Sequence, residues 1–286
     1  MPTRARSISP LPGVRDQFLA RYKFDLRPAT DDRPYFFDFF KWQALPELWT
    51  VSAQSGGALL DWGYLILVAT LVQAAVLSAV LVLLPLWLGI ETQRSAGRWR
   101  IFVYFGAIGL AFLFVEIASI QRFTLFLAHP LYAIGVVLAG FLVFAGLGSG
   151  AAPALEQRLA DTRYGALGAA IAAIVLLAIA YILALPPVFA TLAGLPDPAK
   201  ILLSLILIAP LAFFMGMPFP LALARLRANA PDLVPWAWGI NGCASVLAAI
   251  LATLLAMTAG TRMVVLVAAA LYLAAGLAFA GPARQP

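Results

Sequence analysis

Seven long apolar stretches, separated by short polar segments, constrain this chain more than any other feature. A transmembrane helix needs about 20 consecutive residues that are mostly apolar. The stretches cover residues 62–89, 101–127, 131–150, 165–186, 200–223, 235–258 and 262–280. The regular alternation of polar and apolar residues in a transmembrane β-strand is not visible in the sequence. The pattern therefore predicts an all-α, polytopic membrane protein with about seven transmembrane helices.

The composition agrees with an integral membrane protein. Of the 286 residues, 63% are hydrophobic and 11% are charged, whereas about a quarter are charged in soluble domains. The net charge is +6, but the basic residues gather in the N-terminal tail and in short loops, where they set membrane topology. We therefore expect the lipid bilayer as a partner, and no nucleic acid. With one cysteine and one histidine, the chain lacks a cysteine cluster or a histidine-rich metal site, so no metal is expected.

The chain divides into two predicted parts. Residues 1–57 form an extramembrane N-terminal tail without the apolar core of a cleavable signal peptide. Aromatic residues between positions 34 and 49 predict a segment of this tail that lies on the membrane surface. Residues 58–286 form the helical transmembrane domain.

Charged and amide side chains inside the second apolar stretch form the first candidate site. Glu116, Gln121 and Arg122 lie there, although a charge at membrane depth is energetically unfavourable. Glu116 and Arg122 are six positions apart, which separates them by roughly a third of a turn, so each is expected to meet another helix. Asn241, flanked by glycines, is the first candidate partner for either. Two interpretations stay open: a polar or proton-accepting site, or a structural lock between helices with Arg122 reaching the interface.

Prolines and glycines predict where helices end or pack. His129 and Pro130 form a turn after the second stretch, because a residue before proline avoids helical geometry. Pro218 and Pro220 break the fifth stretch, either as a kink or as a broken helix that binds a ligand. The spacing of Gly146 and Gly150 predicts close packing of helices rather than a dinucleotide-binding loop.

A third candidate lies in the tail, where Asp31, Asp32 and Arg33 precede a proline. Paired carboxylates can do acid–base work or bind a cation. A solvated, charged turn is the alternative, and the sequence alone favours it.

Five segments, in this order, resemble motifs of a bacterial family of multi-pass membrane proteins that is called spermidine synthase-like. The segments are residues 22–37, 112–123, 127–133, 215–220 and 238–242. The resemblance extends over nearly the whole chain from Tyr22 onward. It implies a role in polyamine chemistry and a place in the bacterial inner (cytoplasmic) membrane.

In that family, membrane helices accompany a soluble α/β domain that resembles aminopropyltransferases and methyltransferases and uses S-adenosylmethionine or its decarboxylated form. Residues 1–57 contain no glycine-rich strand–turn–helix unit, so we expect no cofactor within this chain and transfer no catalytic residues to it. The remaining part resembles the membrane half of the family with its junction motif at Asp31, Asp32 and Arg33. The chain is then either a natural split form that works with a separate partner, or the product of a longer gene whose start was assigned too late.

The expected function is that of an accessory, anchoring membrane domain in a spermidine synthase-like system, working with a separate α/β partner subunit. A small-solute (amine) transporter or permease and a structural subunit of a larger membrane complex, bound to other membrane subunits, are the alternatives. Catalysis by this chain alone is not expected, because the sequence offers no nucleophile–base pair, metal cluster or cofactor-binding loop.

Overall fold

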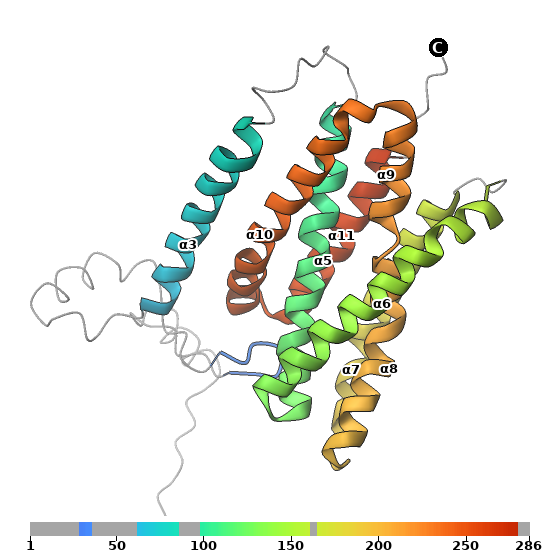
Figure 1. Cartoon of the computed structure of the whole chain (residues 1–286). Coiled ribbons are helices and arrows are strands. Elements are labelled where there is room, and N and C mark those ends of the chain that lie inside the picture. Colours follow the sequence, from blue (N-terminus) through green and yellow to red (C-terminus); the bar gives the residue numbers. More distant parts are fainter. Residues whose placement is uncertain (1–28, 36–61, 86–97, 161–164, 280–286) are drawn as a thin grey trace, which may run out of the picture.

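The computed structural model describes residues 29–35, 62–85, 98–160 and 165–279 (Figure 1). Within these ranges the chain forms helices with short connections, and a single isolated β-bridge joins Thr30 and Arg33. Seven helical segments are long and apolar enough to cross a membrane. The prediction of an all-α polytopic membrane protein is therefore confirmed. Most of the predicted tail, including all of its aromatic surface segment beyond residue 35, lies outside the described residues.

The helices follow one another in the order of the predicted stretches. The first two elements are α3 (Trp62–Ser78) and a π-helical turn, η2 (Ala79–Leu83). The long central helices are α5 (Arg98–Leu127), α6 (Pro130–Arg158) and α7 (Gly165–Leu192). The remaining elements are α8 (Asp197–Met215), α9 (Pro218–Asn229), the 3₁₀ turn η3 (Pro231–Leu233), α10 (Val234–Ala259) and α11 (Thr261–Phe279).

Helix α5 lies at the centre of the bundle, between α10 and α11 (Figure 1). It runs antiparallel to α11, because Arg100 Nε donates to the Ala278 carbonyl near one end and Arg122 Nε donates to Thr261 Oγ1 near the other. Helices α6, α7 and α8 pack on one another and close one side of the bundle, while α3 packs on α10. This arrangement buries α5 more than any other transmembrane segment.

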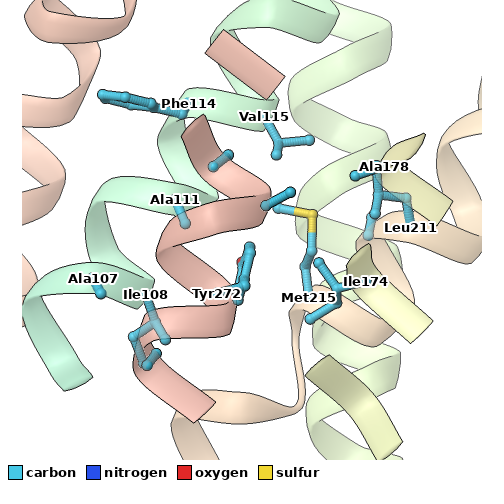
Figure 2. Close-up of a cluster of buried hydrophobic side chains, with 14 of the residues drawn as sticks. Ala107, Ile108, Ala111, Phe114, Val115, Ile174, Ala178, Leu211, Met215 and Tyr272 are labelled. Carbon is cyan, nitrogen blue, oxygen red and sulfur yellow. The ribbon is translucent and has the colours of Figure 1, made fainter. Parts of the chain in front are cut away.

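The core combines small and large apolar side chains from helices α5 to α11. Figure 2 shows Met215 of α8 beside Ile174 of α7, with Tyr272 of α11 and Val115 of α5 close by. Each of these four side chains is less than a tenth exposed. Lipid chains are as apolar as leucine, so helices in a membrane associate through close packing rather than through the hydrophobic effect. Large leucines such as Leu142 and Leu183 are exposed, as expected of a surface that faces lipid.

Glycines produce the closest helix contact, although not the predicted ones. A Cβ atom on Gly148 would lie 1.8 Å from the Phe213 carbonyl oxygen, and one on Gly216 would lie 2.0 Å from the Ala145 carbonyl oxygen. A Cβ atom on Gly146 or on Gly150 would meet nothing within 4 Å among the described residues. Close packing of those two glycines against another helix of this chain was therefore a wrong prediction, because α8 contacts the face of α6 that carries Gly148.

Two predicted helix boundaries at prolines have different outcomes. The fifth stretch does break, and α9 starts at Pro218. Proline suits the first position of a helix, because an N–H there would have no hydrogen-bond partner within the helix. The Tyr104 hydroxyl donates to the Pro218 carbonyl at 2.8 Å and ties this break to α5. Helix α7, in contrast, continues through Pro186 and Pro187 to Leu192, so its predicted end at position 186 was wrong.

Candidate functional site

The candidate site lies where the described tail segment, residues 29–35, meets the ends of α5, α10 and α11. Figure 1 shows this segment in blue at the end of the bundle where α5 finishes. A turn forms there because the Arg33 N–H donates to the Thr30 carbonyl at 2.8 Å, and its neighbour Asp32 points to the start of α11. Asp32 therefore links two segments that are far apart in the sequence.

The Asp32 carboxylate binds the start of α11. Its Oδ1 accepts hydrogen bonds from the Thr261 hydroxyl and from the Arg262 backbone N–H, both at 2.8 Å. Its backbone carbonyl also accepts from the Thr261 N–H at 2.8 Å. The first N–H groups of a helix have no partner within the helix, and a carboxylate there is favoured by the helix dipole. Asp32 is thus an N-terminal cap supplied from the tail, and the predicted solvated turn was wrong for this residue.

Arg122 completes this cluster from α5. It is only 8% exposed, its Nε donates to Thr261 Oγ1 at 3.1 Å, and its Nη2 lies 3.6 Å from Asp32 Oδ1. The Thr261 hydroxyl thus accepts from Arg122 and donates to Asp32. Arg122 meets groups outside its own helix, as its helical phase predicted, and the contacts are those of a lock between α5, α11 and the tail.

The neighbouring junction residues fasten the same turn. Arg33 Nε and Nη2 donate to the Met257 carbonyl at 3.1 and 2.9 Å, which is a favourable position for a cation at the end of α10. Gly260 has a φ of +92°, and a Cβ atom there would lie 2.4 Å from Asp32 Oδ2. The close approach of the tail therefore requires glycine at this turn. Gln121 adds a further contact between α5 and the tail, because its Nε2 donates to the Tyr35 hydroxyl.

A pocket of about 400 Å³ opens beside this cluster. Its charged residues come from the tail, α5 and α11, and its apolar residues come from the last turns of α5, the second half of α7 and the residue that follows α7. The lining consists of Asp31, Asp32, Arg122, Leu125, Phe126, Leu185, Pro186, Phe189, Ala190, Ala193 and Arg262. Its volume is within the usual range of small-molecule sites.

Asn241 does not contact Glu116 or Arg122. Its Nδ2 donates to the Phe105 carbonyl at 3.1 Å, and Ser245 Oγ donates to the Gly109 carbonyl one turn further along α10. Glu116 lies eleven residues after Phe105, about 16 Å along the helix axis. The expected pairing of Asn241 with Glu116 or Arg122 was therefore wrong, and Asn241 instead joins α10 to α5 near the opposite end.

Glu116 is isolated from the cluster around Asp32. Its side chain is 7% exposed, and no hydrogen bond or ion pair to it exists within the described ranges. By helical phase it shares the face of α5 that carries Phe105 and Gly109, and that face packs on α10. Glu116 therefore stays a separate candidate site, apart from Arg122.

The remaining predicted positions shape the turn between α5 and α6. His129 is the residue before α6, and Pro130 is the first residue of that helix. The His129 carbonyl accepts from the Ala133 N–H at 3.0 Å, and its ring contacts the Tyr132 ring edge to face. Ala128 precedes them with a φ of +56°. These contacts are those of a turn residue. Pro220 follows in the first turn of α9, beside the break at Pro218.

Sequence reasoning missed three residues of the site: Thr261, Arg262 and Gly260. A threonine next to a glycine at the start of an apolar stretch is a signal for a helix N-terminus, so the sequence does predict a tight turn at residues 259–262. The sequence could not show that Asp32 of the tail binds this turn. Among the residues that the structure describes, no group of three or more His, Cys, Asp or Glu side chains is placed to hold a metal ion.

No protein-family model, curated protein or solved structure matches this chain. The resemblance to the spermidine synthase-like family therefore rests on the sequence motifs, and the function drawn from it is a proposal.

Proposed function

We propose that this chain is the accessory, anchoring membrane domain of a spermidine synthase-like system, in which the bundle holds the junction segment and thereby positions an α/β, cofactor-binding partner at this face of the membrane. The observation that carries the proposal is the binding of Asp32 to Thr261 and Arg262 at the start of α11. This contact ties the tail to the membrane helices beside an open pocket.

The spatial pairing of the motifs supports the proposal. Two motifs, residues 22–37 and 112–123, meet through the Gln121–Tyr35 hydrogen bond and the Arg122–Asp32 ion pair. Two others, residues 215–220 and 238–242, meet through the rings of Phe219 and Trp238, whose centroids are 4.7 Å apart. Motifs that contact one another across the fold are expected if a family preserves one bundle and one junction.

A partner fixed through the tail would face the pocket. The junction is held to α5, α10 and α11 by side chains that are partly or fully buried, so it is less free to move than a solvated linker. Such a junction limits the orientations that a partner can take over the pocket opening. Substrate that reaches the pocket, an amine or a lipid-borne molecule, would then lie close to the partner's cofactor.

Affinity purification of the tagged full chain from its native membranes tests this function. We expect a stoichiometric partner that binds S-adenosylmethionine or its decarboxylated form, identified by mass spectrometry and by nucleotide binding. Asp32→Ala should release the partner, whereas Asp232→Asn, an exposed carboxylate at the other end of the bundle, should retain it. Thermal unfolding of both variants shows whether the bundle stays folded. Absence of any such partner from the unmodified chain would reject the proposal.

A small-solute (amine) transporter is the second candidate, and buried Glu116 favours it. A carboxylate at membrane depth without a partner in the described part of the chain could meet a cationic solute or a proton. Uptake of labelled spermidine into proteoliposomes tests this candidate. Glu116→Gln, which keeps the shape and removes the charge, should abolish uptake. No uptake by the unmodified chain, or equal uptake by the variant, would remove transport from consideration.

A further inference from the structure

We propose that the pocket beside Asp32 binds a zwitterionic amphiphile, a molecule that carries an ammonium group and an anionic group next to an apolar body. The chain alone builds this pocket, so the inference does not depend on a soluble partner.

One wall of the pocket is apolar and aromatic. Phe126 of α5 and Phe189 of α7 stack with their ring centroids 4.4 Å apart, and the buried Phe123, behind this wall, meets Phe189 edge to face at 5.1 Å. Leu125 and Leu185 extend this wall along the two helices. Ligand sites are mainly apolar with a few polar groups that fix orientation, so this wall suits the apolar body of a ligand.

On the polar wall, Asp32, Arg122 and Arg262 form a cluster in which the two arginines outnumber the one carboxylate. Asp32 Oδ1 lies 3.6 Å from Arg122 Nη2 and 3.9 Å from Arg262 Nε, so two guanidinium groups share one carboxylate. Arg122 is buried and is held by Thr261. The Arg262 side chain is 55% exposed and only loosely paired. Arg262 is therefore the group that can accept an anionic ligand group, for which guanidinium geometry is well suited.

Asp31 supplies the opposite charge. It is exposed, lines the same pocket, and has no hydrogen bond or ion pair within the described segments. Its neighbour Asp32 is already engaged by α11. Asp31 can thus accept hydrogen bonds from a ligand ammonium group while Arg262 binds the anionic group.

This pattern selects against ligands with a single sign of charge. An anionic molecule would place negative charge near Asp31 without a compensating ammonium group, and a cationic molecule would place positive charge near Arg262. A zwitterion can pair its ammonium group with Asp31 and its anionic group with Arg262. Its source is either the membrane, as a phospholipid with an ethanolamine headgroup, or the aqueous phase, as an amino acid with an aromatic side chain.

Calorimetric titration of the detergent-purified full chain tests the site with three probes. The probes are dihexanoyl-phosphatidylethanolamine, dihexanoyl-phosphatidylglycerol and L-phenylalanine. We expect saturable binding of the ethanolamine lipid, about tenfold tighter than that of the anionic glycerol lipid. Binding of phenylalanine as well would assign an aqueous zwitterion to the site, and binding of the ethanolamine lipid alone would assign a membrane lipid.

Two variants test separately the contact with the ammonium group and the contact with the anionic group of the ligand. Asp31→Asn should remove the preference for the ethanolamine lipid over the glycerol lipid. Arg262→Gln should weaken binding of both lipids by about tenfold, while the backbone N–H of residue 262 still donates to Asp32. Asp232→Asn and Arg227→Gln make the same charge changes at exposed positions at the other end of the bundle and should bind normally.

Three results would overturn the inference. They are no saturable binding of a zwitterionic probe, equal affinity of the unmodified chain for both lipids, and titrations of Asp31→Asn and Arg262→Gln that match those of their controls. Thermal unfolding of each sample in the same detergent confirms that any loss of binding comes from a folded protein.

Discussion

The Thr261 hydroxyl donates a hydrogen bond to Asp32 across 229 positions of sequence, at 2.8 Å. The same hydroxyl accepts from Arg122 at 3.1 Å, so one small side chain joins the tail, α5 and α11. In most helices the capping residue immediately precedes the helix. Here the cap comes from the other end of the chain, and the stability of α11 is coupled to the position of the tail.

Loss of the Asp32 carboxylate should destabilise the bundle. Asp32→Ala removes the acceptor for Thr261 and Arg262 and should lower the free energy of unfolding by about 2 kcal/mol, as expected for a lost N-terminal cap. Asp32→Asn should have a smaller effect, because an amide oxygen still accepts the backbone hydrogen bond. Thermal unfolding in one detergent measures both, with Asp31→Asn as the control. Equal melting temperatures for Asp32→Ala and Asp31→Asn would contradict the capping role.

Removal of the Thr261 hydroxyl should be nearly as severe. Thr261→Val keeps the shape but leaves the buried Arg122 Nε without this acceptor and Asp32 without this donor. An unsatisfied buried polar group costs about 1–3 kcal/mol, so we expect a clear fall in the melting temperature. Thr261→Ser restores the hydroxyl and should restore most of the stability. A serine variant as unstable as the valine variant would point to packing instead of hydrogen bonding.

Glycine at position 260 should be required for the tail to bind. Gly260→Ala places a methyl group 2.4 Å from Asp32 Oδ2 and introduces a side chain at a φ of +92°. Both effects act at the turn between α10 and α11, so we expect a lower melting temperature. Limited proteolysis should also cut near residues 29–35 faster, because the displaced segment becomes accessible. Unchanged cleavage would show that the turn accommodates the methyl group.

Three glycines of α6 should respond differently to alanine. Gly148→Ala forces a Cβ atom to 1.8 Å from a backbone carbonyl of α8, which only a separation of the two helices relieves. We expect low yield of folded protein on size-exclusion chromatography in detergent. Gly146→Ala and Gly150→Ala meet open space and should be neutral or more stable by about 1 kcal/mol, the helix propensity of alanine over glycine.

Loss of folding in the Gly146 or Gly150 variants, while the unmodified chain remains monomeric, would contradict the observed register of α6 and α8. Normal folding of Gly148→Ala would do the same. Since all three substitutions are chemically identical, any difference among them reports the position of the neighbouring helix.

The sequence by itself determined the number and order of the transmembrane helices, because hydropathy and length are local properties of each segment. It also located the break before Pro218 and the turn at His129 and Pro130, since proline restricts the backbone where it stands. Helical phase was enough to show that Glu116 and Arg122 would not meet on α5.

Only the tertiary structure decided which residues are partners. Helical phase predicts the face on which a side chain lies, but not which neighbour covers that face or at what depth, so Asn241 was assigned to the wrong residue. The glycine spacing at Gly146 and Gly150 could not show that α8 approaches Gly148. The pairing of Asp32 with Thr261 depends on how the bundle brings the tail to the start of α11. A local pattern carries no information about such a contact, because its energy arises only when both segments are in place.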